Sequence, residues 1–163
     1  MPFEFGRLLW TLHGRNDPAI SGLLPSSLPN SKGIFMSYGF FYLLFNSSMP
    51  GLLKIGYTDR SPSQRAYELS SSTGVPCEFE ILGYFEMLDA RSYEQYVHQT
   101  FDESRVSNSR EFFRISMPQL VDLIEGAIEH GCTYFVEKEV VYRHMKSCEW
   151  MGMASQPSGG WDA

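Results

Sequence analysis

Apolar runs and polar turns alternate between residues 39 and 58 in the pattern of a β-hairpin. The segments 39–45 (GFFYLLF) and 52–58 (LLKIGYT) are rich in aromatic and branched side chains, which favour strands. The intervening residues 46–51 (NSSMPG) are mostly of the types that form turns. We therefore predict two antiparallel strands joined by a short loop.

Beyond the hairpin, helical and extended patterns alternate along the chain. Helix boundary signals support this reading, because Ser61 and Asp89 are candidate N-caps, Pro62 suits a first helical turn, and Gly131 follows the last helical pattern. The helices are expected at 62–71, 89–101 and 117–130, and further strands at 77–87, 110–115 and 134–143. The order β-β-α-β-α-(β)-α-β predicts an α+β fold, in which a small, mainly antiparallel central sheet with a β-β-α-β-α core is flanked by helices.

The two ends of the chain have no lasting periodicity. Residues 1–37 contain repeated Pro, Asn and Ser turn signals and are expected to form an N-terminal arm, with one short helix near 7–13. The remainder divides into a domain at 38–130, a C-terminal strand extension at 131–150 and a flexible tail at 151–163. A strand in the extension could pair by its edge with a second copy of the chain, so a homodimer is one expected assembly.

The charge balance is acidic and unevenly distributed. The 163 residues include 13 Lys and Arg and 19 Asp and Glu, which gives a formal net charge of −6. Residues 1–53 carry 3 basic and 2 acidic groups, residues 54–114 carry 7 and 10, and residues 115–163 carry 3 and 7. Such a composition argues against non-specific coating of nucleic acid, which needs a broad basic surface, but it allows a small local basic site.

The chain also has no sequence feature of a membrane or secreted protein. No apolar run reaches the roughly 18 residues that a membrane span needs, and the N-terminus lacks a signal-peptide pattern. The three cysteines, Cys77, Cys132 and Cys148, form neither a zinc motif nor a disulfide framework. We therefore expect a cytoplasmic protein without a membrane partner.

Five residues that could carry chemistry fall on the predicted core elements. Tyr42 lies in the first strand, Lys54 lies in the second, and Arg65 lies in the first turn of the following helix. Glu94 and His98 are four residues apart and share one face of the next helix. Taken singly, each has an ordinary structural explanation as a core aromatic, a surface charge or a satisfied histidine. Their combination on neighbouring elements indicates a site.

The order of the short motifs resembles the GIY-YIG nuclease superfamily. The first half of the resemblance consists of Gly39-Phe-Phe-Tyr42, residues 49–58 (MPGLLKIGYT), residues 64–70 (QRAYELS) and residues 73–76 (TGVP). The second half consists of Glu94-x-x-Val-His98-x-x-Phe101, Arg105-Val106 and Arg110-Glu-Phe-Phe113. Within the superfamily, the chain is most similar to the phage-ORF and meiotically-up-regulated-gene branch, over residues 38–128.

The resemblance implies a metal-dependent endonuclease that hydrolyses phosphodiester bonds in DNA. It puts the metal ligand at Glu94, which would hold one Mg²⁺ or Mn²⁺, and the phosphate-binding arginine at Arg65. It makes Tyr42 the group that orients or deprotonates the attacking water, with Lys54 and Arg65 favouring the tyrosinate. Lys54 could instead contact phosphate, together with Arg60 and Arg65.

Other roles stay open at this point. His98 could relay a proton, hydrogen-bond to Glu94, or be a satisfied, partly buried histidine. Glu111 is expected to bond within the domain. Three arginines could contact phosphate or pair with the acids among them: Arg105, Arg110 and Arg114.

The chain departs from the superfamily pattern at several positions. Phe40 stands where the first motif has glycine, and Lys54 stands where the second motif has tyrosine, a change that fits the narrower branch. The spacing from Gly56 to Arg65 is one residue longer than in the repair-nuclease branch. The histidine that some relatives carry one turn after the arginine falls on Leu69.

Two other functions are compatible with the same residues. The chain could be a catalytically weak or inactive nucleic-acid-binding module on this fold, with a salt dependence of a few phosphates and no cleavage. It could also be a protein-interaction domain, which would bind neither DNA nor RNA at low salt. The expected partners are accordingly DNA, a second copy of the chain, or another protein.

Overall fold

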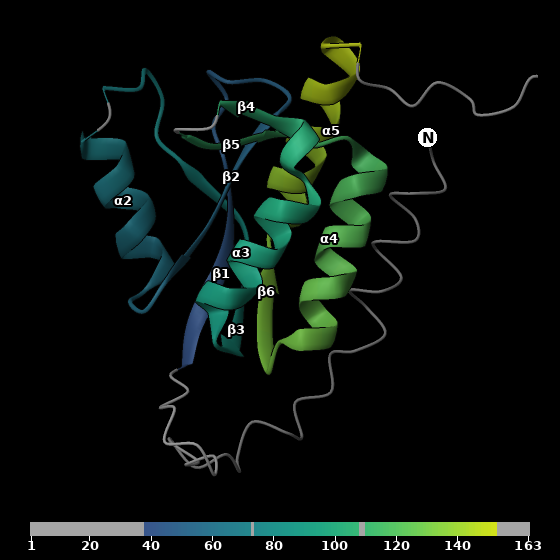
Figure 1. Cartoon of the computed structure of the whole chain (residues 1–163). Coiled ribbons are helices and arrows are strands. Elements are labelled where there is room, and N and C mark those ends of the chain that lie inside the picture. Colours follow the sequence, from purple (N-terminus) through teal and green to yellow (C-terminus); the bar gives the residue numbers. More distant parts are fainter. Residues whose placement is uncertain (1–37, 73, 108–109, 153–163) are drawn as a thin grey trace, which may run out of the picture.

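The computed structural model describes residues 38–72, 74–107 and 110–152 of the chain. The predicted arm at 1–37, with its short helix, and most of the tail at 151–163 lie outside these residues. In chain order the elements are β1 (Tyr38–Phe45), β2 (Leu52–Thr58), α2 (Pro62–Ser72), β3 (Glu80–Leu88), α3 (Ala90–Thr100), η2 (Asp102–Ser104), β4 (Arg105–Ser107), β5 (Arg110–Arg114), α4 (Met117–His130), β6 (Thr133–Val136) and α5 (Lys138–Trp150). The α+β prediction is confirmed (Figure 1).

The strands form one six-stranded sheet in the order β4-β5-β2-β1-β3-β6. Every neighbouring pair is antiparallel, as the sequence predicted for the core. The hairpin is confirmed, since Phe45 pairs with Leu53 next to the turn and Phe40 pairs with Thr58 at the far end. β1 lies between β2 and β3, so its backbone is hydrogen-bonded on both sides.

Helices cover both faces of this sheet, which explains why β1 is apolar at nearly every position. On one face, residues of α3, α4 and α5 bury the larger cluster of the core, which includes Phe41 and Phe85. On the other face, α2 covers a smaller cluster that includes Tyr42 and Leu44. In Figure 1, α2 lies on one side of the sheet and α3 and α4 lie on the other. Because successive strand side chains point to opposite faces, Phe41 and Tyr42 belong to different clusters.

The helices begin and end close to the residues that the sequence predicted. The Asp89 side chain accepts a hydrogen bond from the Ser92 amide at 3.4 Å and so caps α3. Ser116 and Gln119 form a capping box at the start of α4, and Gly131 follows its end. Within the described part of the chain, none of these helices is both long and apolar enough to cross a membrane.

The prediction of a terminal strand is wrong beyond residue 136. The sequence suggests a strand at 134–143, but β6 ends at Val136 and α5 begins at Lys138. The buried residues of this segment follow a helical spacing: Val140, Val141, His144 and Cys148. The extension at 131–150 is therefore a short edge strand followed by a helix. Edge pairing with a second copy would involve the four residues of β6 and not ten.

Buried His144 should make the fold sensitive to acid. Its ring is fully buried, Nε2 donates to the Ile115 carbonyl oxygen at 2.9 Å, and burial lowers its pKa from 6.5 to about 4. Between these values the unfolded chain binds a proton that the folded chain does not, so stability falls as pH decreases, by at most about 3 kcal/mol. His144→Gln should flatten this part of the pH dependence in urea unfolding; a slope equal to that of the wild type would contradict the assignment.

Candidate active site

The predicted site residues gather where β2 extends beyond its neighbour β5. β5 pairs with Leu52–Lys54 of β2. Among the residues that the structure describes, 55–58 have no strand partner on that side, and we call them the open edge of β2. Helix α3 packs against β2, and the His98 ring nitrogen Nε2 lies 3.0 Å from the Ile55 carbonyl oxygen. The open edge therefore brings α3 next to the strand that carries Lys54 and Gly56.

Tyr42 and Gly56 lie directly opposite each other on β1 and β2. The Tyr42 side chain is buried, and a Cβ atom added at Gly56 would lie 2.5 Å from its phenol oxygen and 2.7 Å from Cζ. Glycine is therefore required at position 56 for the Tyr42 ring to occupy this place. From the first turn of α2, Arg65 lies near enough to the Tyr42 phenol for its guanidinium to lower the pKa of the phenol.

The surroundings of Tyr42 keep its phenol protonated at neutral pH. Burial raises its pKa above the ordinary value of 10, and this effect exceeds the lowering by the Arg65 guanidinium. Arg65 acts in the expected direction, since it lowers the pKa, but burial outweighs it and the phenol is the favoured form in the free protein. In this state Tyr42 can hydrogen-bond to a water molecule or a phosphate oxygen, but it is not an ionised base.

Glu94 is a buried carboxyl group on α3, with 6% of its surface exposed. Its pKa is raised from 4.5 to about 7, chiefly by burial and also by the nearby charge of Glu111, while the charges of Arg105, Arg91 and Lys54 oppose the rise. At neutral pH this group is close to half protonated. An added positive charge beside it would favour the carboxylate.

The His98 ring contacts both the open edge of β2 and Glu94. Its Nε2 lies 3.0 Å from the Ile55 carbonyl oxygen and 3.4 Å from Glu94 Oε1. A carbonyl oxygen can only accept, so Nε2 carries the proton. Burial lowers the pKa of His98, which favours the neutral ring. In the neutral ring, the protonated Nε2 faces Glu94 and has no lone pair with which to accept a proton from it. The contact between His98 and Glu94 therefore indicates that His98 positions the carboxyl group.

Lys54 and Glu111 connect the two faces of the sheet at the open edge. The Lys54 ammonium donates to Glu111 Oε2 at 2.8 Å and lies 5.3 Å from the centre of the Phe112 ring. Phe112 packs with the cluster on the α2 side and Phe113 with the cluster on the α3 side. By strand alternation, Glu111 shares the α3 side with Phe113, so the ion pair joins Lys54 to the side that holds Glu94.

The other predicted phosphate contacts are engaged with an acid of α2. Arg60 makes two hydrogen bonds to the Glu68 carboxylate, at 3.1 and 3.3 Å, and Arg65 lies 3.6 Å from the same group. A phosphate would therefore compete with Glu68 for both arginines. Leu69, which stands where some relatives have a histidine, is part of the buried cluster on the α2 side.

The structure thus places the five predicted residues in three pairs, Tyr42–Arg65, Lys54–Glu111 and Glu94–His98, of which Glu111 is the one member not predicted. The pairs adjoin one another, since the charges of Glu94 and Glu111 both raise the pKa of Tyr42. Sequence reasoning gave Glu111 no place in the site. The signal that could have found it was the pairing of β5 with β2, which puts Phe112 opposite Lys54.

Arg105 is a further residue whose place was not fixed by the sequence. Its guanidinium carbon lies 5.1 Å from the centre of the Phe113 ring. Its Nε is buried 3.8 Å from Asp102, with no hydrogen-bond partner among the described residues. Its charge is the largest of the influences that lower the pKa of Glu94. Arg105 therefore balances part of the negative charge on the α3 side of the site.

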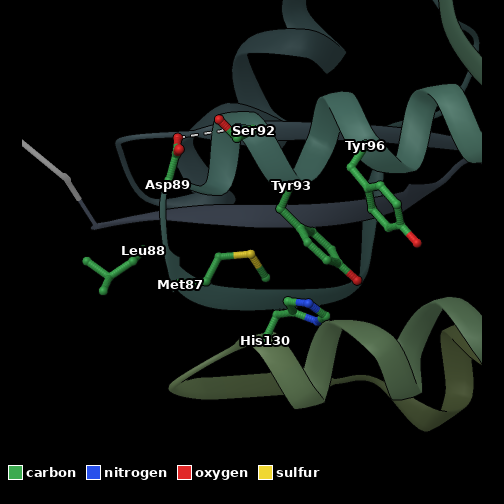
Figure 2. A pocket seen from close by; sticks show the side chains of 7 residues that line it. All are labelled: Met87, Leu88, Asp89, Ser92, Tyr93, Tyr96 and His130. Atoms are coloured by element: carbon green, nitrogen blue, oxygen red, sulfur yellow. Dashed lines mark hydrogen bonds between the residues drawn. The ribbon is translucent and has the colours of Figure 1, made fainter. Parts of the chain in front are cut away.

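A separate pocket of about 360 Å³ lies where the start of α3 faces the end of α4 (Figure 2). Its lining consists of Met87, Leu88, Asp89, Ser92, Tyr93, Tyr96 and His130, none of which is a predicted site residue. Asp89, the N-cap of α3, accepts a hydrogen bond from the Ser92 amide, and His130 Nδ1 donates to the Gly126 carbonyl oxygen at 2.8 Å. These polar groups of the pocket are used to cap or end helices α3 and α4. We therefore take the open edge of β2, where the predicted residues lie, as the candidate active site.

Residues 39–128, more than half of the chain, match the T5orf172 domain. The chain belongs to the T5orf172 domain family. This family is phage-associated and occurs in nuclease contexts, which supports a nuclease or DNA-associated role. Neither a curated protein nor a solved structure matches the chain. The T5orf172 match spans every residue of the three pairs, from Tyr42 in β1 to Glu111 in β5.

Proposed function

We propose that the chain is a divalent-metal-dependent endonuclease that hydrolyses phosphodiester bonds in DNA, through a site of the GIY-YIG type. The observation that supports this most is the position of a buried carboxyl group, Glu94, whose pKa responds to the charges of Lys54 and Glu111 and whose own charge affects the pKa of Tyr42. Phosphodiester hydrolysis needs positive charge on the phosphate, an oriented water and help for the leaving oxygen. The chain offers a group for each of the first two tasks.

The donor chemistry of the site fits Mg²⁺ or Mn²⁺. Within the described residues there is no group of three or more His, Cys, Asp and Glu side chains arranged around a metal position. Mg²⁺ usually keeps several waters and needs one or two carboxylates, which Glu94 can supply with Glu111 close enough to affect its pKa. When bound, the ion would polarise the phosphate and stabilise the leaving oxygen.

Arg65 and Lys54 would bind the phosphate. Arg65 already presents its guanidinium at the Tyr42 phenol, where a planar fork can engage two phosphate oxygens. Lys54 would exchange its bond to Glu111 for a phosphate oxygen, which releases Glu111 to accept from a water. Because Glu68 and Glu111 occupy these cations in the free protein, affinity for bare DNA should be modest.

Tyr42 and His98 would position other groups. The buried phenol of Tyr42 can donate to a phosphate oxygen or hold the attacking water beside Arg65. His98, bonded through Nε2 to the Ile55 carbonyl oxygen, fixes the side of Glu94 that faces the strand. The water's proton would pass to a carboxylate or to solvent, since Tyr42 is not ionised.

The direct test is cleavage of plasmid and single-stranded DNA with Mg²⁺ or Mn²⁺. Arg65→Ala and Glu94→Ala should each lower the rate by about 10²-fold or more, because each removes a group that stabilises the transition state. The controls Lys146→Ala and Glu129→Ala remove the same kinds of charge from exposed positions on α5 and α4 and should cleave like the wild type. Cleavage that survives both site substitutions would overturn the assignment.

A non-catalytic DNA-binding module is the second candidate, and one observation favours it. The phenol of Tyr42 has a raised pKa, so the free site holds no tyrosinate base. This alternative predicts DNA binding that persists in Glu94→Ala and no cleavage with any divalent ion. The same cleavage assay, together with binding in EDTA, separates the two functions.

A further inference from the structure

A row of aromatic side chains crosses the sheet from the candidate active site to the edge strand β6. The register aligns Gly56 with Tyr42, Tyr42 with Tyr84, and Tyr84 with Phe135. The Tyr84 and Phe135 rings are stacked, with centroids 5.4 Å apart and planes 26° apart. Phe40 meets Tyr84 edge-on at 5.8 Å. We call Phe40, Tyr84 and Phe135 the outer aromatic row.

A second aromatic row on the opposite face shows what is unusual about the outer one. Phe41, Phe85 and Tyr134 occupy the neighbouring positions of the same three strands, and helices bury Phe41 and Phe85 completely. In the outer row, Phe40 and Tyr84 are half-buried, and Phe135 is 42% exposed. Three adjoining aromatic rings are more than a solvent-facing edge of a sheet requires, since scattered polar residues would serve there.

We propose that the outer aromatic row binds unpaired bases of the nucleic-acid strand whose phosphate lies at Tyr42 and Arg65. This inference extends the proposed function by naming a strand class, single-stranded or locally opened DNA. Strands in a sheet are about 5 Å apart, so Tyr84 and Phe135 lie within reach of bases near a phosphate at Tyr42. Aromatic platforms beside a backbone-binding group are the usual way of holding single strands without sequence preference.

The charges around the row indicate how such a strand would be held. The charged side chain beside the row is Glu86, which pairs with Phe40 in the register and accepts from the Thr133 hydroxyl at 2.9 Å. The Glu80–Arg143 ion pair stands opposite Phe45, on the other face of the sheet. None of the described residues that pair with the outer row in the strand register is a cation. The contribution of the row would come from stacking, and the phosphate contacts would stay at Arg65, Arg60 and Lys54. Removal of the bases from the strand should therefore lower the affinity for it more than an increase in salt concentration does.

The test is fluorescence anisotropy in EDTA, which prevents cleavage. Two labelled strands of about 12 nucleotides are compared, oligo-dT and an abasic strand with the same phosphates. Wild type should bind oligo-dT about tenfold more tightly than the abasic strand. Phe135→Leu, which keeps apolar bulk but removes the aromatic ring, should lose most of this preference, and Phe135→Trp should keep it. Tyr142→Ala, which alters an equally exposed aromatic on α5, is the matched control.

Each outcome separates this inference from the proposed nuclease activity. Equal affinity for the two strands, or no binding of either, would overturn the stacking surface even if the chain cleaves DNA. A preference for oligo-dT that Phe135→Leu does not change would also overturn it. If Glu94→Gln shows the same base preference but no variant or wild type cleaves, the stacking surface stands and the nuclease proposal fails.

Discussion

Glu94→Gln should abolish metal-dependent cleavage and, at the same time, make the folded chain more stable above about pH 7. Burial raises the pKa of Glu94 from 4.5 to about 7, so folding of the acid form is easier than folding of the carboxylate. The folded chain binds more protons than the unfolded chain between these values. Stability therefore falls as pH rises through this range, and glutamine, which cannot ionise, removes the fall.

The size of the effect follows from the shift in pKa. Each unit corresponds to 1.36 kcal/mol, so the stabilisation by glutamine at about pH 8 is at most about 3 kcal/mol. At about pH 4.5 the two proteins should unfold alike. The measurement is urea unfolding at both pH values, with and without Mg²⁺; the ion should stabilise the wild type at pH 8 and leave Glu94→Gln unchanged, because it binds only the carboxylate.

Glu129→Gln provides the control for charge alone. Glu129 is exposed on α4, so its substitution changes the net charge equally without altering a buried group. A Glu94→Gln protein that is less stable than the wild type at pH 8 would show that the carboxylate makes a structural contact. That result would contradict its assignment as a group kept ionisable for a ligand.

Local patterns were enough to predict the elements of the core, because each has its own boundary signals. The hairpin turn, the Asp89 cap and the Gly131 stop after α4 are all read from a few neighbouring residues. The C-terminal segment was misassigned because Tyr134 to Arg143 combines branched and aromatic residues that favour strands. Tertiary packing decides it, since Val140, Val141 and His144 are buried together by a helix and not by alternation.

In the site, too, contacts between residues close in sequence could be predicted, and contacts between distant residues could not. Glu94 and His98 share a helix turn, so their contact could be predicted from spacing. The partner of Lys54 could not, because Glu111 lies 57 residues away and meets it only through the pairing of β2 with β5. The upward shift of the Tyr42 pKa was also out of reach, since it depends on how completely α2 and the sheet bury the ring.

Gly56→Ala should lower both stability and cleavage, through Tyr42 alone. A methyl group at position 56 would lie 2.5 Å from the phenol oxygen of a ring that is 1% exposed, so the ring must leave its place. Overpacking of this kind costs about 1–3 kcal/mol. Displacement also moves the phenol away from the Arg65 guanidinium, so cleavage should fall by about 10²-fold, as for loss of a single transition-state donor.

A double-mutant cycle tests whether Tyr42 is the cause. In a Tyr42→Ala background the ring is gone, and Gly56→Ala should cost nothing or even stabilise the strand, since alanine has less backbone entropy to lose than glycine. The coupling free energy from urea unfolding should therefore equal nearly the whole cost of the single substitution. Additive costs in the two backgrounds would mean that Gly56 serves the backbone of β2. The tyrosine and the glycine would then be independent features of the strand pair, and the candidate site would lose the contact that holds its phenol in place.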